Sequence, residues 1–252
     1  VSFLKIICFF LISTIGISHG ALDNLKGYKV LKFYGIKKKY LFYLTYIIIS
    51  LIVIFFWILL PLLTLSLFLL VAAYHFGRED SNFGKTKKKK FINLFYFLKG
   101  SVVILAPLFF HTDETIAIFE ILDAKQALVI NETWFITLLA LSFLSNFFVH
   151  DDLGITLPDW FTIIILNVVF SPLVAFTIYF CFLHSVRHSL SLIYELNKNN
   201  FNKGFKEFVK KALPLTIITG VLYLIGVFIL TNSYDLDSAI LKVIFIGLAS
   251  LT

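Results

Sequence analysis

The chain has little charge for its length. Only 15% of its 252 residues are charged and 59% are hydrophobic, whereas soluble domains carry roughly 25% charged and about 45–50% apolar residues. The apolar residues form continuous blocks, and several blocks reach the ~20 residues that a membrane-spanning helix needs. Because lipid admits only helices and closed barrels, we predict an all-α fold. We expect a polytopic transmembrane helical bundle that forms a single integral membrane domain over residues 1–252.

Other residue types and patterns are missing too. The sequence has no Met, and its two cysteines, Cys8 and Cys181, both lie in apolar segments, which argues against a disulfide framework. Phosphate-binding glycine loops, Ser/His/Asp nucleophile patterns and paired catalytic carboxylates are absent as recognisable motifs. We also find no carboxylate within the apolar blocks. Nucleotide-dependent and hydrolytic chemistry are therefore not indicated.

Positive charge is confined to short segments between the blocks. The formal net charge is +7, and the lysines gather in residues 26–39, 85–90 and 198–211. Short lysine-rich loops are typical of the cytoplasmic side of a membrane protein. We therefore expect a lipid bilayer, and no nucleic acid, as the partner of this charge.

The apolar blocks predict about 7–8 membrane segments. They cover residues 3–17, 40–76 (two spans divided at Pro61), 91–110, 133–149, 160–184 (interrupted at Pro172), 212–230, and a short stretch from Ala239. For the first block a secretory signal peptide is the alternative, because Lys5 precedes it and small residues follow it.

The lysine-rich segments constrain the number of crossings. If all three face the cytoplasm, an even number of helices must cross between Lys90 and Lys198, yet only three blocks lie there. We therefore expect a re-entrant or broken helix near residues 100–122, where Gly100 and Pro107 interrupt the block. Such a segment is tolerated at membrane depth where it lines an internal cavity.

Four histidines point to a metal site. His184 and His188 are spaced i, i+4 and share one helix face, while His75 and His19 close two other predicted spans. The ends of all three helices lie toward the lysine-rich side, so the four side chains can share one membrane depth. Imidazole suits Zn, Cu, Fe and Ni. We predict a metal site made of histidines alone, with no catalytic residue beyond the ligands.

Three further residues are candidates for supporting roles. Asp23 and Asp80 lie within about a turn of His19 and His75, and either carboxylate could orient a metal-bound imidazole as a second-shell group. The alternative for both is a solvated loop acid at a helix end. His111 follows the expected broken helix and is predicted to lie near the site.

The histidine contexts, taken in order, resemble the Brp/Blh family of bacterial and archaeal β-carotene 15,15′-dioxygenases over essentially the whole chain. The matching pieces are His19-Gly20-Ala21-Leu22-Asp23, His75-Phe76-Gly77 with Glu79-Asp80, Leu105-Ala106-Pro107-Leu108-Phe109-Phe110-His111 with the acidic pair after it, and Leu183-His184-Ser185 with Arg187-His188. One departure is Asn24, which stands where the family often has a second histidine. Members also commonly continue past the position of Thr252 into a further helix.

The resemblance implies the chemistry. It implies Fe(2+) held by His19, His75, His184 and His188, and central cleavage of β-carotene by O₂ into two molecules of retinal. It further implies a multi-pass enzyme of the bacterial or archaeal cytoplasmic (inner) membrane that supplies chromophore to a retinal-binding rhodopsin.

Two other classes remain as alternatives. A non-haem iron hydroxylase or desaturase of lipids carries similar histidine pairs, but two irons need more ligands than six histidines provide. A non-enzymatic, histidine-rich metal or proton transporter, or a haem-binding cytochrome, is the second alternative. A transporter is expected to carry carboxylates inside its spans.

Overall fold

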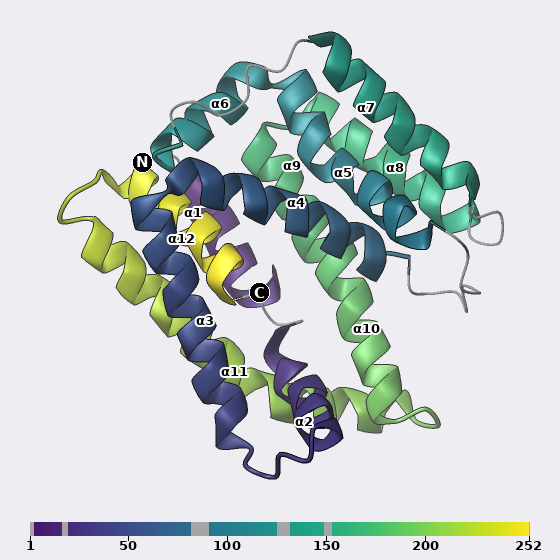
Figure 1. Cartoon of the computed structure of the whole chain (residues 1–252), viewed down its shortest axis with the longest axis vertical. Helices are drawn as coiled ribbons and strands as arrows, with labels where there is room; N and C mark the ends of the chain where they lie inside the picture. The colour runs from purple at the N-terminus through teal and green to yellow at the C-terminus, as the bar shows by residue number, and fades with distance from the viewer. Residues whose placement is uncertain (1–2, 17–19, 82–90, 125–131, 149–152, 252) are drawn as a thin grey trace. The chain divides into compact units, whose positions relative to one another are not determined.

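The computed structural model describes residues 3–16, 20–81, 91–124, 132–148 and 153–251. Within these residues every regular element is a helix, as Figure 1 shows. The chain forms two compact units. The first comprises Val1–Leu60 with Ser185–Thr252, and the second comprises Pro61–His184. The all-α prediction is confirmed for the described residues, while the single membrane domain stays a prediction.

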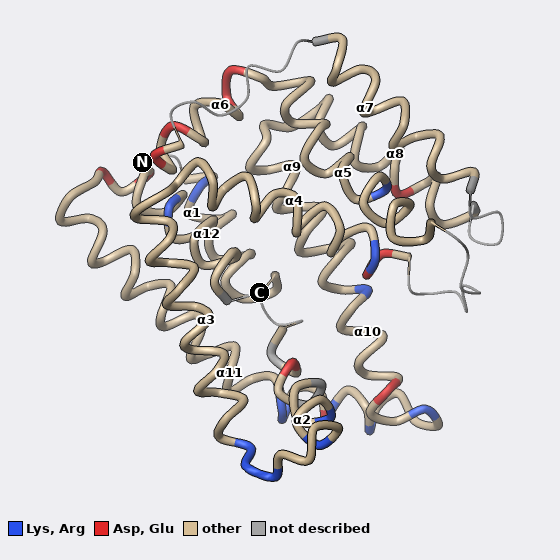
Figure 2. Tube along the Cα trace, in the orientation of Figure 1, with Lys and Arg blue, Asp and Glu red and all other residues tan. Residues whose placement is uncertain are grey.

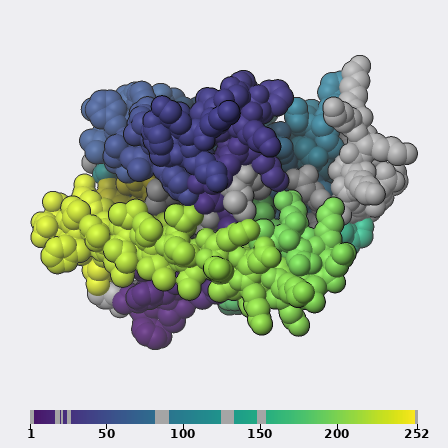
Figure 3. All heavy atoms as spheres, turned by 90° about the horizontal axis from the view of Figure 1, so that it is seen from below, coloured from purple at the N-terminus to yellow at the C-terminus, as the bar shows by residue number. Residues whose placement is uncertain are grey.

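Helices of membrane-spanning length and composition occur in both units. Among the described residues five helical runs qualify: α3 (Tyr40–Leu59), α4 (Pro61–Glu79), α5 (Ile92–Phe110), the continuous run Pro172–Leu196, and α11 (Phe201–Leu230). Shorter apolar helices cover Phe3–Gly16, Thr133–Ser145 and Gly154–Val169. Most of the apolar surface of α3 and α11 is exposed, and Figure 3 shows side chains of α11 on the surface of the molecule. Such surfaces are suited to contact with lipid.

The first unit is built around its two termini and α11. Helix α1 (Phe3–Leu11) continues as π-helix over Ile12–Gly16 and packs on α12 (Leu236–Leu251), where Lys5 Nζ donates to Asp237 at 3.0 Å. A second contact joins α10 (Ser185–Leu196) to α11 through an apolar cluster of Leu22, Leu192, Ile193, Phe208 and Ala212. The remaining helix, α2 (Asp23–Phe33), packs on α3. The first apolar block is therefore an integral part of this unit's packing.

The second unit depends on close packing of α4 against α5. A Cβ atom added at Gly77 would overlap the carbonyl oxygen of Tyr96, and one added at Gly100 would overlap that of Ala73. Glycine therefore lets the two backbones touch, as small residues do between membrane helices. Around this pair pack α6 (Thr112–Ile121), α7 (Glu132–Ser145) and α8 (Leu153–Val169), followed by α9 (Pro172–Ile178) and the π-helical segment Tyr179–His184.

Two helix boundaries differ from the sequence prediction. The break expected near residues 100–122 falls at His111 (φ −138°, ψ 53°), since Gly100 and Pro107 both lie inside α5. The predicted block 160–184 is divided at Pro172 as expected, but its two parts belong to separate helices. Helix α8 ends at Val169, and Pro172 is the first residue of α9, a position at which a backbone N–H has no partner within the helix. In the described part of the chain, four apolar helical runs therefore lie between the last two lysine-rich segments. The parity argument for a re-entrant hairpin no longer holds.

Candidate metal centre

The site begins at Asp80, the residue directly after α4. Its Oδ1 accepts a hydrogen bond from His184 Nδ1 at 2.9 Å, and its Oδ2 accepts one from the Tyr179 hydroxyl at 2.6 Å. All three side chains are buried, and His184 is 0% exposed. An ionised carboxylate can only accept, so Nδ1 of His184 carries a proton, and in the neutral imidazole the lone pair is then on Nε2. This is the arrangement that orients a histidine toward a metal ion.

A π-helical turn brings Tyr179 and His184 to the same carboxylate. They are the first and last residues of the segment Tyr179–His184. In an α-helix, side chains five residues apart point about 140° away from each other. In a π-helix the hydrogen bond runs from residue i to i+5, so such residues lie on one face. The local π geometry therefore makes the two hydrogen bonds to Asp80 possible.

His75 lies beside His184. The two ring centroids are 5.4 Å apart, and Phe76 packs edge-on against His184 with centroids at 4.9 Å. Phe180 stacks on the same imidazole, with 15° between the planes. Two imidazoles that bind one first-row metal ion at about 2.1 Å per nitrogen have centroids roughly 4.5–5.5 Å apart. The donor set that the second unit provides, two imidazoles and an orienting carboxylate, fits such an ion.

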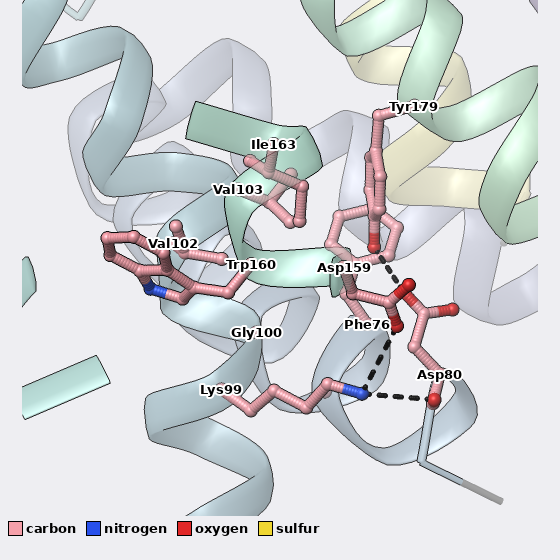
Figure 4. Close-up of a pocket in the computed structure, with 11 residues that line it drawn as sticks. Phe76, Asp80, Lys99, Gly100, Val102, Val103, Asp159, Trp160, Ile163 and Tyr179 are labelled. Carbon is pink, nitrogen blue, oxygen red and sulfur yellow. Dashed lines mark hydrogen bonds and ion pairs between the residues drawn. The ribbon is translucent and has the colours of Figure 1, made fainter. Parts of the chain in front are cut away.

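A buried lysine, which sequence analysis did not single out, extends the site. Lys99 is 5% exposed; its Nζ donates to the Asp80 carbonyl at 3.0 Å and to Ser81 Oγ at 3.2 Å. It also forms an ion pair of 3.7 Å with Asp159 Oδ2, as Figure 4 shows. The expectation that the spans contain no carboxylate is wrong, because α8 begins at Leu153 rather than at residue 160 and so includes Asp159, which is 6% exposed. A lysine within an apolar block was the signal that could have found this network.

The charges around Asp80 keep it ionised. Burial raises the pKa of the Asp80 carboxyl, whereas the hydrogen bonds from His184 and Tyr179 and the charge of Lys99 lower it. The network surrounds a cavity of about 10 Å³, lined also by Gly100, Trp160 and other residues of α4, α5 and α8. That volume holds about one water molecule.

The predicted metal ligands fall in different parts of the structure. His75 and His184 lie together in the second unit, His188 lies on α10 in the first unit, and His19 lies outside the described residues. Among the residues that the structure describes, no group of three His, Cys, Asp or Glu side chains converges as metal ligands do. The four-histidine set therefore stays a prediction.

The supporting candidates also differ from one another. Asp80 does contact a predicted ligand, although it binds His184 rather than the nearby His75. Asp23 begins α2, with its Oδ2 3.5 Å from the position of a Cβ on Gly20. His111 Nε2 donates to the Asn167 carbonyl at 2.7 Å, and it lies roughly 18 Å of helix rise beyond Lys99. A role for His111 near the site stays a prediction.

The fold and the site define a class of protein. Long apolar helices, and a buried set of histidine, aspartate and tyrosine with a second histidine beside it, are typical of integral membrane proteins that carry a histidine site. The sequence profile of the β-carotene 15,15′-dioxygenase family matches residues 10–252, and the chain belongs to this family of enzymes. The family resemblance seen in the sequence is thereby confirmed.

A curated relative agrees with this assignment. The β-carotene 15,15′-dioxygenase of uncultured marine bacterium 66A03 is 28% identical over 267 residues, which cover 96% of this chain and 88% of that protein. No solved structure matches the chain significantly.

Proposed function

We propose that this protein cleaves β-carotene with O₂ at its central 15,15′ double bond and releases two molecules of retinal, using Fe(2+) held by His19, His75, His184 and His188. The observation that carries the proposal is the buried pair of His75 and His184, with Asp80 bonded to Nδ1 of His184. Family membership supports the reaction. The metal, its oxidation state and all four histidine ligands are the proposed part.

The residues of the second unit have separable tasks in this reaction. Ferrous iron, when bound, supplies the activation of O₂. Asp80 holds the His184 proton on Nδ1, so that Nε2 can act as a ligand, and Tyr179 fixes the carboxylate in turn. The rings of Phe76 and Phe180 surround the imidazole and exclude water from it. Neutral imidazole ligands leave the ion's positive charge uncompensated.

The substrate and the location fit the same proposal. β-Carotene is a long hydrocarbon that partitions into lipid, so an enzyme with membrane-spanning helices meets it at high local concentration. Apolar positioning of the polyene would fix which double bond lies beside the metal. We propose the cytoplasmic (inner) membrane of a bacterium or archaeon as the location, and a retinal-binding rhodopsin as the acceptor of the product.

Expression in a β-carotene-producing bacterium tests the function. With the wild-type protein we expect the orange pigment to fall and two molecules of retinal to appear per carotene lost, measured by chromatography of extracted pigment. His184→Ala should form no retinal and should lose bound iron. His150→Ala is the matched control; this histidine is followed in the sequence by Asp151 and Asp152 and lies outside the described residues. It should keep activity. Persistent carotene without retinal, in correctly inserted wild-type protein, would refute the proposal.

A further inference from the structure

Two of the contacts of Lys99 lie at the turn that ends α4. The side chain leaves α5 and reaches the turn that ends α4, where it meets the Asp80 carbonyl and Ser81 Oγ. A buried ammonium group is costly unless it is paired and hydrogen-bonded. Asp159 supplies the counter-charge from α8. Three helices therefore contribute to holding this turn, as Figure 4 shows for Lys99, Asp159 and Asp80.

The turn itself is held at several further points. Ser81 Oγ donates to the Gly77 carbonyl at 2.6 Å, and the Asp80 N–H donates to the Phe76 carbonyl at 3.0 Å. The last carbonyls of a helix have no partner within it, and a lysine can supply one. Lys99 thus binds the main chain of Asp80, while the side chain of the same residue binds His184 and Tyr179. The main chain and the side chain of Asp80 are therefore both held by hydrogen bonds.

We propose that Lys99, held in place by Asp159, is a positioning residue for the metal site: it fixes the main chain of Asp80 so that its carboxylate orients His184 Nε2 for metal binding. This inference rests on the proposed function, because it assumes that His184 is a ligand. Lys99 acts through Asp80 and needs no contact with iron or carotene.

A simpler role for Lys99 makes a different prediction. If the lysine only caps α4 and pairs a buried charge, its loss lowers the stability of the protein and leaves metal affinity alone. Removing both charges at once separates the two roles. Replacing a buried ion pair by neutral side chains of similar volume is often neutral for stability, whereas loss of a group that orients a ligand weakens metal binding about 10- to 100-fold.

The test is a Co²⁺ titration of metal-free protein in detergent, followed by visible absorption and accompanied by thermal unfolding. The test variant is the neutral pair Lys99→Met with Asp159→Asn. The matched control is Lys242→Met, which removes another buried lysine, 4% exposed, whose Nζ lies 4.4 Å from the Tyr234 ring centroid in the first unit. We expect the test variant to unfold near the wild-type midpoint and to bind Co²⁺ at least about tenfold more weakly. Lys242→Met should keep the wild-type affinity.

The possible outcomes are distinguishable. Wild-type Co²⁺ affinity in the test variant would overturn the positioning role and leave the proposed function intact. Wild-type affinity in His184→Ala, titrated in parallel, would overturn the ligand assignment and this inference with it. If the test variant does not fold, Asp159→Asn alone keeps the volume and loosens Lys99. It should weaken Co²⁺ binding in the same direction, and unchanged affinity there would also refute the role.

Discussion

At the scale of single residues, the Asp80 carboxylate determines which nitrogen of His184 is available. A carboxylate bonded to Nδ1 fixes the tautomer and the ring orientation, and it raises the basicity of Nε2. The Tyr179 hydroxyl occupies the second oxygen of the same carboxylate, so Asp80 cannot rotate without losing a buried hydrogen bond. The orientation of the His184 imidazole therefore depends on the negative charge of Asp80, on the Asp80–His184 hydrogen bond and on the Tyr179–Asp80 hydrogen bond.

Replacing Asp80 by Asn should weaken metal binding without changing the side-chain volume. The amide can still accept from Nδ1, but it lacks the negative charge, so we expect iron affinity to fall about 10- to 100-fold. Iron bound per protein at limiting iron measures the effect. Tyr179→Phe keeps the Asp80–His184 bond and should cost less than Asp80→Asn. If Asp80→Asn bound as much iron per protein as the wild type at limiting iron, this role of the carboxylate would be contradicted.

At the scale of helices, the glycine contact between α4 and α5 brings Lys99 on α5 close to Asp80 at the end of α4. Gly77 lies one turn before Asp80, and Gly100 directly follows Lys99. Because the two backbones touch at these glycines, the lysine reaches the turn at the end of α4. The π-helical turn Tyr179–His184 provides the tyrosine and the histidine that bind the Asp80 carboxylate.

Gly77→Ala should separate α4 from α5. The added methyl group would overlap the Tyr96 carbonyl, which is backbone and cannot move aside cheaply, so we expect a loss of about 3 kcal/mol in stability. The unfolding midpoint in detergent measures it. Gly154→Ala on α8 is the matched control, because a Cβ there meets nothing within 4 Å. Equal midpoints for Gly77→Ala and the wild type would show that the helices can separate without cost.

At the scale of the whole molecule, charge is distributed as a membrane protein requires. In the first unit, lysines lie around the α2–α3 connection and the start of α11, while the rest of α3 and α11 carries no charge, as Figure 2 shows. Exposed aromatic residues, including Phe33 and Tyr34, lie beside the lysines of the α2–α3 connection. Lysine and aromatic residues together are typical of the membrane interface.

Four apolar helical runs between the lysine-rich segments predict a definite topology. If all four cross, Asp113 and Asn199 lie on opposite faces of the membrane. Both native cysteines are buried, so single Asp113→Cys and Asn199→Cys substitutions can be labelled with a membrane-impermeant reagent. We expect labelling of Asn199→Cys only from the cytoplasmic side and of Asp113→Cys only from the other side. Labelling of both from one side would restore the re-entrant hairpin.

The sequence by itself determined the membrane class and the family, and it singled out the candidate histidines, because block length, composition and short motifs are local properties of the chain. It also placed Asp80 near the site through its distance from His75. Only the tertiary structure decided that Asp80 binds a histidine 104 positions away, that Lys99 and Asp159 join it, and that α8 and α9 are separate helices. Those features depend on which helix faces meet, and the contact of Gly77 with Gly100 fixes that choice for α4 and α5.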